Sequence, residues 1–125
     1  MSPKRVRINV IIFGLEEDLS NHLEAAVTRT GIVLGTKEAA SPEECIDSIR
    51  DDERDVIFCG PNLADIRTLR DRCPNAAIIV LSRAAEVSDW IDALEAGADD
   101  YYAIPLDQMQ VEWMLQLLSS RAKAA

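Results

Sequence analysis

Three consecutive acids, Glu16, Glu17 and Asp18, form a dense group of potential metal ligands in this chain. They follow an apolar run that ends at Phe13, and carboxylate oxygens after a strand are ligands that Mg²⁺ prefers. The same acids would also fall in the first turn of a helix, where negative side chains complement the helix dipole. We expect this second role, because the rest of the sequence does not complete a metal site.

The possible nucleophiles are scattered along the chain. Cys45, Cys59 and Cys73 form no C-x-x-C pair, so a metal or redox motif has little support. Cys59 ends an apolar run, where burial would raise the pKa of its thiol and make it inert; we interpret it as a core residue rather than a sensor. His22 has no implied partner and is expected at the surface. We therefore expect no enzymatic activity, metal or cofactor.

Composition and charge restrict the class of protein. The 125 residues suit one domain, 1–125, and 48% of them are apolar, as in ordinary globular proteins. The net charge of −9 arises from 22 acids against 13 bases. Such a surface repels nucleic acid and anionic lipid, so we expect neither as a direct partner. The apolar runs are too short for a signal peptide or a membrane span, which favours the cytoplasm.

Five apolar runs of strand length alternate with five segments of helical period. The runs are 6–13, 31–36, 55–59, 76–82 and 100–104, and the helical segments are 16–30, 42–52, 62–73, 86–96 and 107–121. Short links make each helix a crossover between parallel strands. The predicted fold is α/β, with a five-stranded parallel sheet, doubly wound, of flavodoxin type and strand order 2-1-3-4-5. The closing "SSRAKAA" resembles a fraying helix end and is compatible with a piece of a longer protein.

Each helical segment carries an apolar stripe that we expect to face the sheet. The stripes are Leu19, Leu23, Ala26, Val27 and Thr30; Cys45, Ile46 and Ile49; Leu63, Ile66 and Leu69; Val87, Ile91 and Leu94; and Val111, Leu115 and Leu118. Three helix ends have recognisable signals. Ser41 followed by Pro42 predicts a helix start, Gly97 a helix end, and Asp107 a second start.

Three segments together resemble the receiver domain of two-component response regulators, the CheY-like fold. "DALEAGADDYYAIPLD" (92–107) is similar to the family's end of helix 4, strand 5 and start of helix 5. "IIVLS" (78–82) is similar to strand 4, and "DVIFCG" (55–60) to the strand that normally ends in the phosphoacceptor aspartate. The resemblance covers nearly the whole chain. It implies a role in signal transduction, with a protein partner or a fused effector domain that reads the output.

The resemblance also implies a phosphorylation site, most of whose groups are missing. A working receiver has two acids after strand 1 for Mg²⁺, an aspartate nucleophile, a hydroxyl residue and a lysine. The matching positions here are Gly14 and Leu15 for the acids, Gly60 for the nucleophile, Ser82 for the hydroxyl and Ile104 for the lysine. Tyr101 matches the family's switch aromatic. Losses after three separate strands predict a pseudo-receiver, which cannot be phosphorylated.

We expect the degenerate site to be closed. Leu15 and Ile104 can pack against each other, and Arg83 can pair with Glu16 or Glu17. The family often has a cis peptide before the proline of strand 5, so we expect one at Ile104–Pro105.

Aromatic residues gather in the last third of the chain and predict an interaction face. Its expected members are Trp90, Tyr102, Met109, Trp113 and Leu117. Exposed apolar patches rich in Trp and Tyr mark protein interfaces, and the resembled family uses this face for dimerisation and output. We therefore expect a homodimer or a docked protein partner there. The competing interpretation is that both tryptophans lie flat over the domain's own edge.

A small-ligand binding domain of the same fold, for a nucleotide or a flavin, is the alternative function. Phosphate binding would require a glycine-rich turn at a helix N-terminus. The first loop, "FGLEED", has one glycine and three acids, which repel phosphate, so we favour the interaction module.

Overall fold

One parallel sheet of five strands organises the protein, in the order β2-β1-β3-β4-β5. The computed structural model describes residues 8–51, 54–83 and 86–120. The strands are β1 (Ile8–Phe13), β2 (Val33–Ala39), β3 (Arg54–Cys59), β4 (Ala77–Ser82) and β5 (Asp100–Ala103). The helices are α1 (Glu17–Thr30), α2 (Pro42–Asp47), α3 (Leu63–Arg72), α4 (Val87–Ala96) and α5 (Gln108–Ser120). The predicted fold class and strand order are confirmed.

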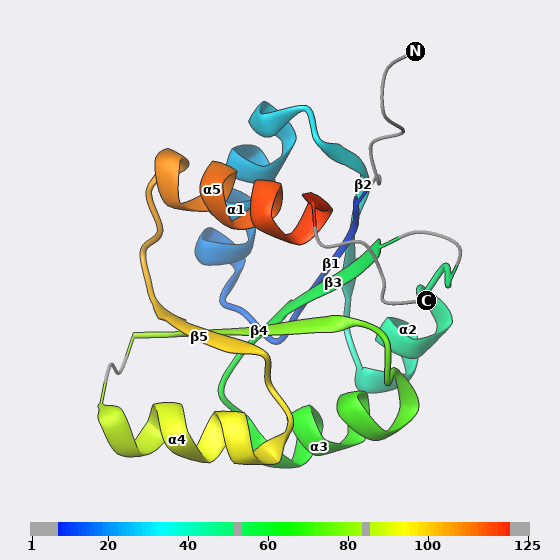
Figure 1. The fold of residues 1–125 in the computed structure, drawn as a ribbon, viewed down its shortest axis with the longest axis vertical. Coiled ribbons are helices and arrows are strands. Elements are labelled where there is room, and N and C mark those ends of the chain that lie inside the picture. Colours follow the sequence, from blue (N-terminus) through cyan, green and yellow to red (C-terminus); the bar gives the residue numbers. More distant parts are fainter. Residues whose placement is uncertain (1–7, 52–53, 84–85, 121–125) are drawn as a thin grey trace.

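The helices form two layers around the sheet. Figure 1 shows α1 and α5 on one face, and α2, α3 and α4 on the other. Residues of β1 and β3 alternate between the two cores that result: Ile12 and Phe58 belong to the core under α1 and α5. Their neighbours Ile11 and Ile57 belong to the core under α2, α3 and α4. These strands are therefore buried on both faces, which explains their unbroken apolar runs.

The three predicted helix ends are confirmed by their local geometry. The Ser41 hydroxyl accepts a 3.2 Å hydrogen bond from the Glu44 amide, with Pro42 in the first turn of α2. Gly97 ends α4 with a φ of 122°. Asp107 accepts from the Gln110 amide at 2.8 Å and so caps α5. Among the described residues, no helix is long and apolar enough to cross a membrane.

A buried polar pair shortens the second helix, which we expected to reach residue 52. Asn9 and Asp55 face each other across β1 and β3, and the Asn9 amide donates to the Asp55 carboxylate at 2.9 Å. The same carboxylate accepts from the backbone amides of Arg50 and Asp51, at 3.1 and 3.2 Å. These bonds hold the chain before β3 in a non-helical conformation, so α2 ends at Asp47.

The expected buried stripe of α4 is wrong. Val87, Ile91 and Leu94 are 65%, 47% and 38% exposed, whereas the buried residues of α4 are Ala93 and Ala96. Small side chains allow a helix to approach its neighbours closely, and bulky ones on that face would hold α4 away. The bulky apolar stripe of α4 therefore points to solvent.

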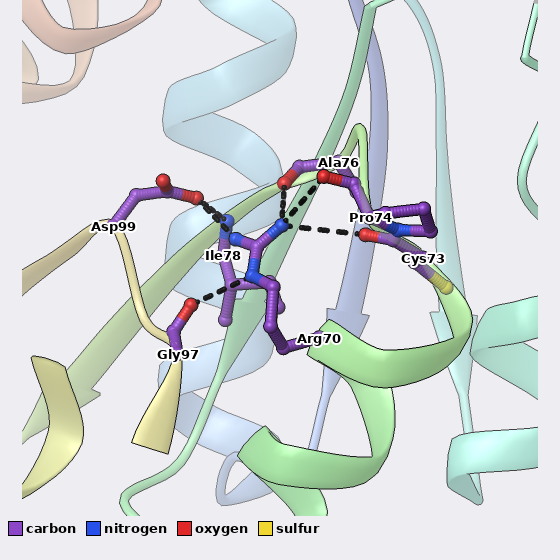
Figure 2. Close-up of polar contacts among 7 residues, drawn as sticks. All are labelled: Arg70, Cys73, Pro74, Ala76, Ile78, Gly97 and Asp99. Carbon is purple, nitrogen blue, oxygen red and sulfur yellow. Dashed lines mark hydrogen bonds and ion pairs between the residues drawn. The ribbon is translucent and has the colours of Figure 1, made fainter. Parts of the chain in front are cut away.

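Arg70 of α3 forms hydrogen bonds with the segment between α4 and β5 and with the segment before β4 (Figure 2). Its guanidinium donates to the backbone carbonyls of Gly97, Cys73, Pro74 and Ala76 at 2.8 to 3.4 Å, and to the Asp99 carboxylate at 2.6 Å. Asp99 also accepts from the amide of Ile78 in β4, at 2.7 Å. A Cβ on Gly97 would come within 2.7 Å of the Arg70 side chain, so this contact requires glycine.

The expected sheet-facing stripe of α5 is confirmed. Val111, Leu115 and Leu118 are buried in the core that α5 shares with α1. Met114 is buried beside them, and the sequence interpretation did not include it.

Candidate functional site at the carboxyl ends of the strands

The residues at the degenerate phosphorylation positions lie close together at the carboxyl ends of the strands. Phe13 of β1 pairs with Cys59 of β3, so Gly14 and Gly60 follow side by side. Ser82 of β4 pairs with Ala103 of β5, directly before Ile104. The Ile104 amide donates to the Ser82 carbonyl at 3.0 Å. Carboxyl strand ends are where open α/β sheets place their ligand sites.

The backbone of Gly14 fills the space that a side chain at position 60 would need. A Cβ atom added to Gly60 would lie 2.8 Å from the Gly14 carbonyl oxygen, well inside van der Waals contact. Gly14 itself has a φ of 72°, in the left-handed region that glycine adopts without strain. The two glycines therefore depend on each other: one provides the turn, and the other provides the room for its carbonyl.

The remaining positions of the site are apolar. Leu15 and Ile104 are half-buried, and both pack against the core under α1 and α5. They line a small hollow together with Leu19, Leu81 and Pro105. The Ile104–Pro105 peptide is cis, as expected. This end of the sheet therefore presents hydrocarbon where the resembled family places a lysine and an acid.

The charged residues near the site lie on its surface. Arg83 pairs with Glu16 at 3.4 Å, one of the two expected partners, and both side chains are more than half exposed. Glu17 and Asp18 lie in the first turn of α1, as the helix-dipole interpretation predicts. Among residues 8–51, 54–83 and 86–120, no group of three His, Cys, Asp or Glu side chains is placed to hold a metal ion.

The positions that match the family's hydroxyl residue and switch aromatic are buried to different degrees. Ser82 is buried at the end of β4. Tyr101 and Tyr102 are both half-buried and face opposite sides of the sheet, because successive strand residues alternate. Tyr101 packs on the core under α2, α3 and α4, and Tyr102 on the core under α1 and α5. Their aromatic rings therefore border both helical layers at the β5 edge.

The three thiols are free and buried in one core. Burial raises the pKa of Cys45 and of Cys59 to about 12, and also raises the pKa of Cys73. A protonated thiol is a poor nucleophile, which agrees with the interpretation of Cys59 as a core residue. His22 is exposed, with its Nε2 atom 3.3 Å from the Leu106 carbonyl oxygen.

Both helices beside β5 expose bulky apolar side chains. On α5, Met109, Trp113 and Leu117 are 78%, 59% and 39% exposed. On α4, Trp90 is 45% exposed and stands among the outward-facing residues Val87, Ile91 and Leu94. The interpretation in which the tryptophans lie flat over the domain's edge does not describe Trp113, most of which contacts solvent.

Val87, Ile91 and Leu94 of α4 are the part of this surface that the sequence did not predict, whereas Trp90 was an expected member. Two alanines, Ala93 and Ala96, share the helix with the bulky residues on the opposite side. The presence of two competing apolar stripes, one small and one bulky, was the available signal.

No family model matches the chain. A relative is RegA, the photosynthetic apparatus regulatory protein of Cereibacter sphaeroides, which is 27% identical over 100 residues. The match covers 77% of this chain and 54% of RegA, so the chain spans about half the length of this curated relative.

Solved structures show the same fold. A putative response regulator from Chloroflexus aurantiacus has a TM-score of 0.76 at 21% identity, covering 92% of this chain and 99% of that one. The beryllofluoride-activated NtrC4 receiver domain, solved as a dimer, has a TM-score of 0.72 at 17% identity, covering 89% and 95%. The chain therefore has the CheY-like receiver fold.

Proposed function

We propose that this chain is a pseudo-receiver: a non-enzymatic signalling module that acts through protein–protein contacts and does not depend on phosphorylation. The observation that carries the proposal is the Gly14 carbonyl oxygen, which occupies the space of a side chain at position 60. The receiver fold and the likeness to RegA, a regulatory protein, support the signalling role.

The chemistry of phosphotransfer explains why this site suits such a module. An acyl phosphate needs a carboxylate nucleophile, and Gly60 has no side chain. The developing charge needs cations, but the nearby positions are occupied by Leu15 and Ile104. The one arginine at this edge with a described ion pair, Arg83, is held by Glu16 on the surface.

The test is incubation with acetyl phosphate or beryllofluoride in the presence of Mg²⁺. We expect no mass increase and no saturable NMR shifts at residues 14, 60 and 82. A stoichiometric, acid-labile phosphate adduct would overturn the proposal.

A restoration variant sharpens this test. Gly60→Asp is expected to remain unphosphorylated, because its Cβ collides with Gly14 and because the acid pair and lysine are still missing. Acid-labile phosphate on Gly60→Asp would show that the rest of the site is competent after all.

The proposed interaction surface lies on α4, β5 and α5 and contains Trp90, Tyr102, Met109, Trp113 and Leu117. We propose that a second copy of the chain, or another protein, binds there. The exposure of Trp90, Met109 and Trp113 supports this, since aromatic anchors dominate interface energetics. The dimer of the NtrC4 receiver domain supports self-association as one use of the fold.

Sedimentation of the wild type and of Trp90→Ala/Trp113→Ala tests the homodimer. We expect the wild type to dimerise as concentration rises and the double variant to remain monomeric. A wild type that stays monomeric at high concentration would remove the homodimer.

Two further parts of the proposal have simple tests. We place the protein in the cytoplasm, supported by its three free thiols, because oxidising compartments favour disulfides. Fractionation of the source cells tests the location.

Titration with nucleotides and FMN tests the small-ligand alternative, and a saturable, stoichiometric response would favour it over the interaction module.

A further inference from the structure

The outward face of α4 is an apolar ridge along the whole helix. Its members are Val87, Trp90, Ile91 and Leu94, which are 65%, 45%, 47% and 38% exposed. Their spacing of three and four residues places them on one side of the helix. We call these four residues the α4 ridge. Positions of this kind normally face a core or another helix, yet the domain's own core contacts the opposite side, through Ala93 and Ala96.

The α4 ridge is bordered by negative charge. The segment 86–96 contains four acids, Glu86, Asp89, Asp92 and Glu95, and no Lys, Arg or His. Three of the four are exposed, and Asp89 is half-buried. Within the described part of the chain, none of the four forms an ion pair.

The described arginines at the two ends of α4 are already engaged elsewhere. Arg83, before the helix, pairs with Glu16. Arg70, beside the end of the helix, pairs with Asp99 and donates to backbone carbonyls. The negative border of the α4 ridge is therefore available to a partner's positive charges.

The charge distinguishes the α4 ridge from the apolar residues of α5. Met109, Trp113 and Leu117 are accompanied mainly by glutamines, with one acid, Glu112, between residues 108 and 118. That nearly neutral surface suits a second copy of the chain. Two α4 ridges facing each other would instead bring the exposed acids of both helices together, and like charges at an interface are costly. Anionic lipid is disfavoured for the same reason.

We infer that the α4 ridge binds an amphipathic helix of another protein whose apolar stripe is flanked by Lys and Arg. Two helices pack by interdigitating such stripes, and flanking opposite charges select the partner and its orientation. The inference rests on the proposed function and refines it: the homodimer would rely on β5 and α5, and α4 would receive a different protein.

The probe is a labelled synthetic helix with leucines at three- and four-residue spacing and lysines on both flanks. Two matched peptides serve as controls: one with the same composition in scrambled order, and one with glutamates in place of the lysines. We expect the lysine peptide alone to bind saturably in fluorescence anisotropy, and to shift the NMR signals of α4. Equal binding of the scrambled peptide, or shifts confined to other elements, would overturn the inference.

Variants of the domain separate the contribution of the ridge from that of the charge. Trp90→Ala/Leu94→Ala is expected to weaken binding at least about tenfold. Asp92→Lys/Glu95→Lys is expected to weaken the lysine peptide by about tenfold and to improve the glutamate peptide. Asp18→Lys/Glu24→Lys makes the same change of net charge with exposed residues of α1, on the other face of the sheet (Figure 1). It is expected to leave binding nearly unchanged. If both charge variants weaken binding equally, the attraction is non-specific and the inference fails.

Sedimentation and peptide binding of a Trp113→Ala variant keep this result distinct from that of the homodimer. Trp113→Ala is expected to abolish self-association while the lysine peptide still binds. A monomeric wild type that binds the peptide would remove the homodimer and retain the α4 inference. A wild type that dimerises but does not bind the peptide would retain the homodimer and overturn the α4 inference.

Discussion

At the amino ends of the strands, polar groups form two hydrogen-bonded networks: buried Asp55 accepts from Asn9 and two backbone amides, and half-buried Arg70 binds Asp99 and four carbonyls. At the carboxyl ends lie Gly14 and Gly60, where the Gly14 carbonyl oxygen takes the space that a side chain at position 60 would need. The comparison shows that these polar interactions, which position the strands and α4, lie at the amino ends of the strands. The residues at the carboxyl ends, where this fold places its chemistry, can therefore change without removing these interactions.

The largest expected loss of stability is at the amino ends of the strands. Asp55→Ala should lower the free energy of unfolding by about 3 kcal/mol, because two backbone amides and one N–H of the Asn9 amide lose their acceptor. The other N–H of Asn9 keeps its hydrogen bond to the Ser48 carbonyl. Urea denaturation measures the loss. Asp92→Ala, which removes an exposed carboxylate, is the matched control. Similar losses in the two variants would mean that the Asp55 network does not stabilise this edge.

Arg70→Ala should lower the free energy of unfolding by about 2 kcal/mol, since several carbonyls and Asp99 lose their donor. The measurement is again urea denaturation, and NMR should show the largest shifts near Gly97 and Asp99. Arg67→Ala removes an exposed arginine from the same helix and should have little effect. If Arg70→Ala behaves like Arg67→Ala, the contacts in Figure 2 are not important for stability.

The close fit of Gly14 and Gly60 at the carboxyl ends of the strands can be tested by alanine substitution of two glycines. Gly60→Ala should cost about 1.5 kcal/mol, because its Cβ must displace the Gly14 backbone. Gly35→Ala adds the same methyl group to β2, where no atom lies within 4 Å, and should cause no loss. Thermal or urea unfolding of both variants gives the comparison. A Gly60→Ala variant as stable as Gly35→Ala would show that the Gly14 backbone can move away from the new methyl group at little cost in free energy.

The smallest effect is expected from Glu16→Gln. The Arg83–Glu16 pair is mostly exposed, and such pairs contribute less than about 0.5 kcal/mol. Stability in urea should therefore be nearly unchanged, and insensitive to salt. A clear loss would indicate that this ion pair, unlike ordinary surface pairs, contributes to the stability of the domain.

The elements that could be predicted from the sequence are those with a single dominant pattern. The strands follow from the length of the apolar runs, and the caps at Ser41, Gly97 and Asp107 follow from local hydrogen bonding. The strand order follows from the alternation of strands and helices in a doubly wound sheet. The end of α2 could not be predicted, because it depends on an acceptor, Asp55, that β3 supplies.

Periodicity alone could not orient α4. It shows that a stripe exists but does not reveal the width of the space that receives it, and here only Ala93 and Ala96 fit. The positions of the candidate site were predicted from the family resemblance. The Gly14–Gly60 contact was not, because it is a distance between backbones that only the folded chain defines.

The alanine face of α4 also affects how the domain opens. Two alanines bury far less apolar surface than the buried residues of α5, so α4 has less apolar contact with the domain, and Arg70 binds the Gly97 carbonyl at its end. Elements with little buried apolar area separate first in partial unfolding. Hydrogen exchange should therefore be faster in α4 than in α5 at the same stability of the whole domain. Equal protection of the two helices would show that the domain opens only as one unit.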